Sequence, residues 1–171
     1  MKRLLICLGL LIPVFAGADD FPKRKPGLWE IRTSIPGHGP AQTMKQCIDA
    51  ASDAKLAQMG KSMGENMGAQ CAKNEFRKED GKFISESDCT AGGTRMISKS
   101  VFSGDFNSRY TSETTTRYDP PMMGTKEQKM TLSARWVGPC EAGQKPGDVI
   151  LPSGMKMNIN SMGTLGGSGK K

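Results

Sequence analysis

The sequence predicts an all-β protein: an antiparallel sheet of six or seven strands with one short helix and two disulfides. Apolar and polar residues alternate along Leu28–Ile35 and Lys126–Val137, which is the pattern of strands that bury one face. Cys71–Cys89 has the composition of a β-hairpin with a cysteine at each end. Short turns separate the apolar runs, which favours antiparallel neighbours. The sequence leaves open whether the sheet closes into a barrel or packs as a sandwich.

The first 18 residues have the three regions of a secretory signal peptide. Met1-Lys2-Arg3 is basic, the run from Leu4 to Phe15 is apolar, and Ala16-Gly17-Ala18 is a small-residue cleavage site. The apolar run is shorter than the roughly 20 residues that span a bilayer. We therefore expect export, cleavage after Ala18, and no transmembrane segment once the signal is removed.

Residues 19–160 are expected to form one domain, because a chain of this length suits a single hydrophobic core. The lead-in Asp19–Pro26 is polar and contains two prolines, so we predict a loose segment. Residues 161–171 are rich in glycine and lysine and have little to bury. They are predicted to be a disordered tail.

The first half of the domain is predicted to contain two strands and the helix. Leu28–Ile35 should place Trp29 and Ile31 on its buried face, and Gln42–Ile48 is a weaker second strand. Ser52 or Asp53 can cap a helix that ends near Met59. The glycines spaced after Met59 favour an irregular stretch.

The Cys71–Cys89 hairpin is predicted to turn through a three-residue loop, Glu79-Asp80-Gly81, whose glycine takes a positive φ. With that loop Lys78 faces Lys82, and counting outward places Cys71 opposite Cys89.

A disulfide between those two cysteines has a consequence for the other two. Four cysteines remain after signal removal, and an even number in an exported protein indicates disulfides. The Cys71–Cys89 pairing leaves Cys47 to pair with Cys140. The alternative, a zinc site, would normally need closely spaced pairs such as C-x-x-C, which these four cysteines do not form.

The second half is predicted to begin with a hairpin of Thr94–Phe102 and Phe106–Tyr118, with Phe102 facing Phe106. Asp119-Pro120-Pro121 should end it. In the last strand, Lys126–Val137, four apolar residues are expected to point inward: Met130, Leu132, Ala134 and Trp136. A short apolar patch follows at Val149-Ile150-Leu151.

The sequence offers few candidate catalytic residues. The only histidine, His38, lies in a Gly-Pro loop, and the cysteines are expected to be oxidised, so a serine or cysteine nucleophile would lack its usual base. We therefore expect a non-catalytic binding or interaction protein without a cofactor, and the sequence does not identify its ligand.

Three methionines suggest an alternative function. Met59, Met63 and Met67 recur at every fourth residue, so a helix would place their thioethers on one face, and thioethers select Cu(I). The alternative is thus an exported copper(I)-binding protein. Against it, methionine commonly fills gaps in small cores, and interleaved glycines disfavour a rigid helix.

Basic residues suggest one further partner class. Arg109, Arg117, Lys129 and Arg135 fall on one face of the predicted sheet by parity, and the formal net charge is +7. This face would suit weak docking onto an anionic surface, although dispersed charges also simply solvate a sheet. A small amphipathic ligand is another alternative. An exported protein is not expected to meet nucleic acid.

The chain resembles the bacterial family known as domain of unknown function 3617 over most of residues 21–160. The resemblance is carried by Pro26-Gly27-Leu28-Trp29-Glu30, by the spacing of the four cysteines, and by the segments Arg135-Trp136-Val137-Gly138-Pro139-Cys140 and Gly143-Gln144-Lys145-Pro146-Gly147-Asp148. It implies an exported protein of the Gram-negative periplasm, with no assigned activity and no catalytic residues to carry over.

Overall fold

The computed structural model describes residues 21–66 and 68–162. The predicted signal peptide, Met67 and the last nine residues of the predicted tail lie outside the described residues. The described part has nine strands and two helices. Their bounds are β1 Gly27–Ser34, β2 Gln42–Ile48, α1 Ala50–Asn66, β3 Gln70–Glu79, β4 Lys82–Ala91, β5 Thr94–Gly104, β6 Arg109–Met122, β7 Thr125–Gly138, β8 Asp148–Ile150, β9 Lys156–Asn158 and α2 Ile159–Met162.

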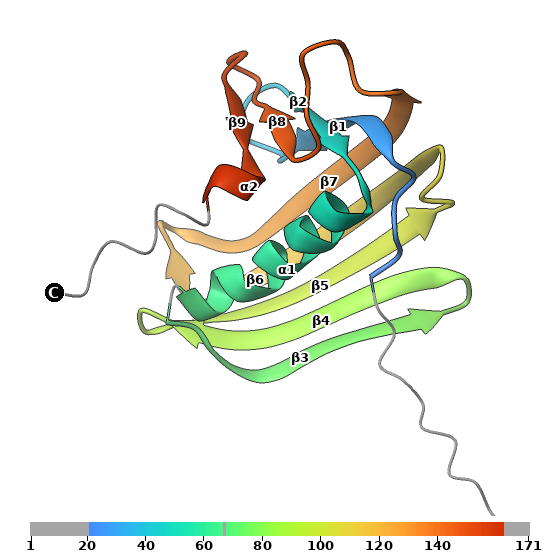
Figure 1. The fold of residues 1–171 in the computed structure, drawn as a ribbon. Coiled ribbons are helices and arrows are strands. Elements are labelled where there is room, and N and C mark those ends of the chain that lie inside the picture. The colour runs from blue at the N-terminus through green and yellow to red at the C-terminus, as the bar shows by residue number, and fades with distance from the viewer. Residues whose placement is uncertain (1–20, 67, 163–171) are drawn as a thin grey trace, which may run out of the picture.

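All nine strands form one antiparallel sheet in the order β3-β4-β5-β6-β7-β1-β2-β8-β9, and α1 lies along one face of it (Figure 1). The all-β prediction is therefore confirmed. The sheet is open, because β3 and β9 at its two edges do not pair with each other. The predicted number of strands is too low, since β8 and β9 have only three residues each and show too little alternation to be recognised.

The helix α1 is longer than predicted. The Asp49 carboxylate accepts a hydrogen bond from the Ser52 backbone N–H at 2.8 Å, and the Ser52 hydroxyl oxygen accepts one from the Asp49 backbone N–H at 2.9 Å. This reciprocal capping begins the helix earlier than the predicted cap at Ser52 or Asp53. The helix then continues through Gly60 and Gly64 to Asn66, so the predicted irregular stretch is wrong up to that residue.

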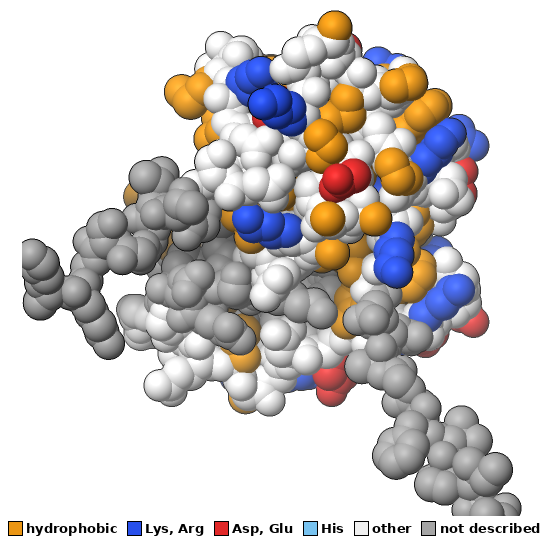
Figure 2. Space-filling view, viewed as in Figure 1, with side chains coloured by type: hydrophobic (Ala, Val, Ile, Leu, Met, Phe, Trp, Pro, Cys, Tyr) orange, Lys and Arg blue, Asp and Glu red, His pale blue; other side chains and the backbone are white. Residues whose placement is uncertain are grey.

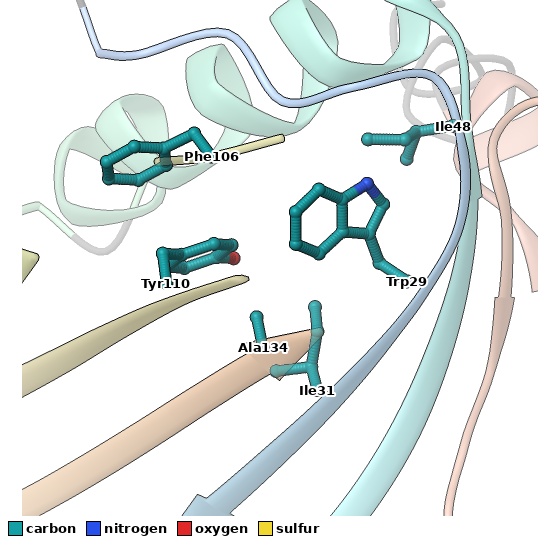
Figure 3. Packing of buried hydrophobic residues seen from close by; sticks show 6 residues of the cluster. All are labelled: Trp29, Ile31, Ile48, Phe106, Tyr110 and Ala134. Atoms are coloured by element: carbon teal, nitrogen blue, oxygen red, sulfur yellow. The ribbon is translucent and has the colours of Figure 1, made fainter. Parts of the chain in front are cut away.

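The hydrophobic core lies between α1 and the face of the sheet that α1 covers, here called the inner face. Figure 3 shows Trp29 between Ile48 and Tyr110, with the Tyr110 ring stacked on Phe106. Trp29 is completely buried, and Leu56 brings α1 against this cluster. The predicted inward direction of the alternating residues in β1 and β7 is confirmed.

The lead-in is part of the core, so the predicted loose segment is wrong from Phe21 onward. The Phe21 ring contacts the rings of Phe76, Phe102 and Phe106. Arg24 is buried, its backbone N–H donates to Asp53 Oδ2 at 2.9 Å, and its Nε donates to Asp53 Oδ1 at 2.8 Å. A polar composition predicted looseness because it cannot reveal a buried partner far along the chain.

Two deviations from the predicted β3–β4 hairpin cancel each other. The turn has two residues, Asp80 and Gly81, with φ of 50° and 75°, as in a type I′ turn, so Glu79 rather than Lys78 faces Lys82. A bulge between Cys71 and Lys73 then shifts the register back. Cys71 consequently lies opposite Cys89 as predicted.

Both disulfides join the predicted partners, Cys71 with Cys89 and Cys47 with Cys140. Cys47 pairs with Leu28 across β1–β2, and Leu28 also pairs with Gly138 at the end of β7. The second disulfide therefore links the two neighbours of β1 within an open sheet. It does not bring the two sheet edges together.

The β5–β6 hairpin has a different register from the predicted one, but its strand residues lie on the predicted faces of the sheet. Phe102 lies opposite Ser112 instead of Phe106, a shift of an even number of residues that leaves every side chain on its predicted face. Phe106 sits in the connecting loop with a φ of 54° and is buried. Strand β6 also passes the predicted stop at Asp119-Pro120-Pro121 and ends at Met122. At the C-terminal side, α2 crosses the predicted domain boundary at residue 160.

Candidate functional site

The side of the sheet away from α1, here called the outer face, carries most of the charged strand residues. In the view of Figure 2, which shows the helix-covered side, Lys and Arg side chains are scattered over the surface. On the outer face, cross-strand register places charges in rows. One row runs from Arg109 on β6 through Arg135 on β7 and Glu30 on β1 to Lys45 on β2.

Ion pairs neutralise most of the outer face. Glu86 on β4 lies within salt-bridge distance of Lys73 at 2.7 Å, Arg77 at 3.2 Å and Lys99 at 3.4 Å. The hydrogen bonds from Lys73, and then from Arg77, lower the pKa of Glu86 to about 2. Arg95 binds Asp88 in a bidentate fashion. Two carboxylates of β4 thus hold basic side chains of β3 and β5 in place.

A groove on the same face has more basic than acidic side chains. It has a volume of about 590 Å³ and lies where β5, β6, β7 and β1 run side by side. We call it the basic groove, and its lining residues are Glu30, Arg32, Ser103, Gly104, Arg109, Tyr110, Thr111, Ser133, Ala134 and Arg135. Three guanidinium groups and one carboxylate give it an excess of positive charge.

The three arginines of the basic groove are not equivalent. Arg135 Nε donates to Glu30 Oε1 at 2.9 Å. Arg109 lies directly opposite Arg135, where two like charges repel. Within the groove, Arg32 and Arg109 are the two basic side chains that form no salt bridge with a carboxylate of the described chain. Elsewhere on the outer face, Lys82 beside the β3–β4 turn also forms none. The groove therefore offers two guanidinium groups that no carboxylate of the described chain satisfies.

The backbone at Arg109 is held by the preceding loop. The Asp105 carboxylate accepts hydrogen bonds from the backbone N–H groups of Asn107 at 2.8 Å, Ser108 at 2.6 Å and Arg109 at 3.1 Å, and from the Ser108 hydroxyl. These bonds, led by that from the Ser108 hydroxyl, hold the pKa of Asp105 well below its usual range. The loop is therefore fixed in the charged state of Asp105, and Arg109 starts β6 from a defined position.

Gly104 lies at the start of the same loop and packs directly against the backbone of β6. Its φ is 140°, and a Cβ atom there would lie 2.5 Å from the Arg109 carbonyl oxygen and 2.6 Å from Tyr110 Cα. Only glycine fits, since both the conformation and the close approach exclude a side chain.

Hydroxyl groups line the groove beside the arginines. Ser103, Thr111 and Ser133 face one another across β5, β6 and β7, and Ser133 lies opposite Arg32 on β1. The second row of the groove is thus a run of three hydroxyls that ends at a guanidinium. Each hydroxyl can donate one hydrogen bond, and that of Thr111 donates to the Ser103 carbonyl oxygen at 3.5 Å.

The alternation of residues along the predicted strands identified part of this site. The four predicted basic residues do share the outer face, but only Arg109 and Arg135 come together in the groove. Arg117 and Lys129 instead share Glu127, at 2.9 Å and 3.9 Å. Arg32 was missed as a site residue, although the alternation of Leu28–Ile35 already placed it on the outer side of its strand.

The inner face beyond the aromatic core is polar. Ser98 and Ser100 on β5 share hydrogen bonds with Thr116 and Thr114 on β6, at 2.6 Å and 2.8 Å. These hydroxyls satisfy one another across the strands.

The remaining predicted site residues lie apart from the groove. Met59 and Met63 belong to α1, four residues apart and hence on one side of the helix, whereas Met67 lies outside the described residues. His38 is in the turn between β1 and β2. Within residues 21–66 and 68–162, no three His, Cys, Asp or Glu side chains gather as metal ligands. In the same part of the chain, no helix has the length and apolar character needed to cross a membrane.

Comparison with known proteins gives one match. Residues 24–140 match the sequence profile of a family described as "Protein of unknown function (DUF3617)". The matched range begins at the buried Arg24 and ends at Cys140 of the second disulfide. No curated protein and no solved structure matches the chain.

Proposed function

The chain belongs to the DUF3617 family of proteins of unknown function, and on that premise we propose that it is an exported, non-catalytic protein that binds an anionic partner in the basic groove. One observation carries the proposal. On an outer face where carboxylates pair most of the other basic side chains, Arg32 and Arg109 line a groove without such partners. An anion is the ligand that complements them.

The groove residues support binding rather than catalysis. Guanidinium groups keep their protons at all physiological pH values, so they offer hydrogen bonds and charge but no proton transfer. The groove contains no histidine or cysteine, and hydroxyls without an adjacent base are weak nucleophiles.

Export to the periplasm is part of the same proposal. Two disulfides are typical of proteins that fold in an oxidising compartment, and residues 1–18 have the composition of a signal peptide. Cells that produce the full chain should release the protein on osmotic shock with Asp19 at its N-terminus. Retention of residues 1–18 in the intact mass would contradict the cleavage.

The anion-binding proposal predicts that the groove, and not net charge alone, determines retention on an immobilised polyanion. The variant Arg32→Gln/Arg109→Gln/Arg135→Gln should elute from heparin resin at a clearly lower NaCl concentration than the unmodified protein. Salt dependence is expected because these contacts are solvent-exposed.

A matched control is available on the same face. Arg95→Gln/Arg117→Gln/Lys129→Gln removes the same number of charges, but these side chains already pair with Asp88 and Glu127. This variant should elute close to the unmodified protein. Equal loss of retention in both variants would mean that only net charge matters, and the proposed site would be wrong.

Copper(I) binding is the second candidate. The observation that favours it is the length of α1, which continues through Gly60 and places Met59 and Met63 on one side of a helix. The test is anaerobic competition for Cu(I) against a chromogenic chelator. Binding that survives Met59→Leu/Met63→Leu/Met67→Leu, or no binding at all, would remove this candidate.

A further inference from the structure

We propose that the basic groove recognises a phosphate group carried by a larger molecule, in preference to a carboxylate. This inference rests on the proposed function, because it names the chemical class of the anion. It follows from three properties of the groove: the number of its donors, their arrangement over four strands, and its size.

The donors of the groove suit an anion with more than two oxygens. The guanidinium groups of Arg32 and Arg109 each carry five N–H donors, and neither has an acidic partner within the described chain. Three hydroxyls, from Ser103, Thr111 and Ser133, line the same hollow. A carboxylate presents two oxygens in one plane, whereas a phosphate monoester presents three oxygens arranged around phosphorus.

The donors also come from different directions. Arg109 projects from β6 and Arg32 from β1, with β7 between them, while Ser103 belongs to β5. Neighbouring strands are about 4.8 Å apart, and Arg32 pairs with Ser133 whereas Arg109 pairs with Arg135, so the two arginines start roughly 12 Å from each other on a diagonal across β7. They can approach one anion from opposite sides, with Ser133 beneath it. A tetrahedral anion directs its oxygens to both sides and downward at once, whereas the two oxygens of a carboxylate lie in one plane.

Arg135 reinforces this arrangement without serving as the main donor. Its Nε is occupied by Glu30, so its charge faces the groove while its position is fixed. Glu30 in turn adds a negative charge at the rim. A ligand must therefore gain more from Arg32 and Arg109 than it loses through repulsion by Glu30, which favours a group with three oxygen acceptors over one with two.

The size of the hollow indicates that the phosphate belongs to something larger. A volume of about 590 Å³ falls within the range of sites that hold a whole small molecule. A phosphosugar and the headgroup of a phospholipid share the required chemistry, and the two sources can be separated experimentally.

The experiment compares two sugars that differ in the anion alone, glucose 6-phosphate and glucuronate. It uses the mature protein at pH 5, below the second pKa of a phosphate monoester at about 6, so both probes carry about one negative charge. We expect glucose 6-phosphate to bind at least tenfold more tightly by isothermal titration calorimetry. Arg109→Gln and Arg32→Gln should each weaken its binding at least fivefold, and Arg117→Gln should leave it unchanged.

A second arm identifies the source of the phosphate. Flotation with phosphatidylcholine vesicles that contain phosphatidic acid is compared with vesicles that contain oleate. Groove-dependent flotation with phosphatidic acid alone supports a lipid headgroup, and tight binding of glucose 6-phosphate without flotation supports a soluble ligand.

The outcomes separate this inference from the proposed function. Equal affinity for both sugars and equal flotation with both vesicles would overturn phosphate selectivity and leave anion binding intact. Groove-dependent heparin retention without binding to any phosphate probe would do the same. Loss of the difference between the groove variant and its matched control on heparin would overturn the proposed function as well.

Discussion

Arg24 is the residue whose environment differs most from the exposed, loose segment that the sequence around it predicts. Its guanidinium is buried and contacts Asp53 at the start of α1, Gln46 on β2 at 2.9 Å, and the Tyr110 hydroxyl at 3.4 Å. Burial raises the pKa of Tyr110, partly offset by the charge of Arg24, so Tyr110 stays a neutral hydrogen-bonding group. One side chain therefore joins the lead-in, the helix and two strands.

Asp53→Ala should destabilise the protein strongly. The substitution leaves the Arg24 guanidinium buried without its carboxylate, a change that typically costs about 3–5 kcal/mol. The midpoint of urea unfolding should fall accordingly. The double variant Arg24→Leu/Asp53→Leu should recover part of the loss, because it removes both charges together.

The control for this prediction is Glu30→Ala, which removes the partner of a solvent-exposed arginine. Exposed pairs contribute little to stability, so its urea midpoint should stay near that of the unmodified protein. If Asp53→Ala and Glu30→Ala unfolded at the same urea concentration, the Arg24–Asp53 pair would not be an anchor of the fold.

At the scale of elements, the three-stranded unit β3–β4–β5 depends on charges that cross between strands. Glu86 is in the middle of this unit, and its side chain is 20% exposed among three basic neighbours. Edge strand β3 is mostly exposed, so it has little apolar burial to hold it. Cross-strand ion pairs and the Cys71–Cys89 disulfide are what fasten it to β4.

The depressed pKa of Glu86 predicts a window of acid destabilisation. Its folded-state pKa is about 2, compared with an ordinary value of 4.5, so its contribution to stability is complete above pH 4.5 and is lost as the pH falls toward 2. The urea midpoint of the unmodified protein should therefore drop more steeply between pH 5 and pH 2 than that of Glu86→Gln.

Glu113→Gln serves as the reference for this measurement, because Glu113 lies on the same face without a salt bridge to any described residue. Its midpoint should follow that of the unmodified protein at each pH. A Glu86→Gln profile with the same slope would show that the Lys73 and Arg77 contacts do not stabilise the folded state.

At the scale of the whole molecule, the alternation of apolar and polar residues along the strands predicted more of the fold than the turn residues did. In β1, β5, β6 and β7 the side of the sheet that the residues face followed from the two-residue period, and it survived a wrong register in β5–β6 because that error was even. Turn lengths failed where a local alternative existed, as at Asp80-Gly81, where a two-residue turn and a compensating bulge replaced the three-residue loop. Contacts such as Arg24 with Asp53 join segments far apart in sequence, and no local pattern reports them.

In the candidate site too, the local pattern was predictive and the pairing between distant strands was not. Parity placed Arg109 and Arg135 on one face, but whether a basic residue has a partner depends on the register between strands. Arg117 meets Glu127, and Arg109 meets Arg135. Arg32 joins the groove because β1, a strand distant in sequence, inserts beside β7 in the sheet.

The disulfides set the stability of the whole open sheet, and they should contribute unequally. Cys47–Cys140 closes a loop with a sequence separation of 93, and Cys71–Cys89 one with a separation of 18. The chain-entropy argument gives about 4 to 5 kcal/mol for the longer loop and about 3 kcal/mol for the shorter.

Cys47→Ala/Cys140→Ala should therefore lower the melting temperature more than Cys71→Ala/Cys89→Ala. Cys47 is also almost fully buried, which adds a packing loss to the entropic one. In differential scanning calorimetry the fully reduced protein should melt below either variant, because it lacks both links. A melting temperature that does not change on reduction, or a larger loss from the β3–β4 pair, would show that the edge hairpin and not the β2–β7 link holds the sheet together.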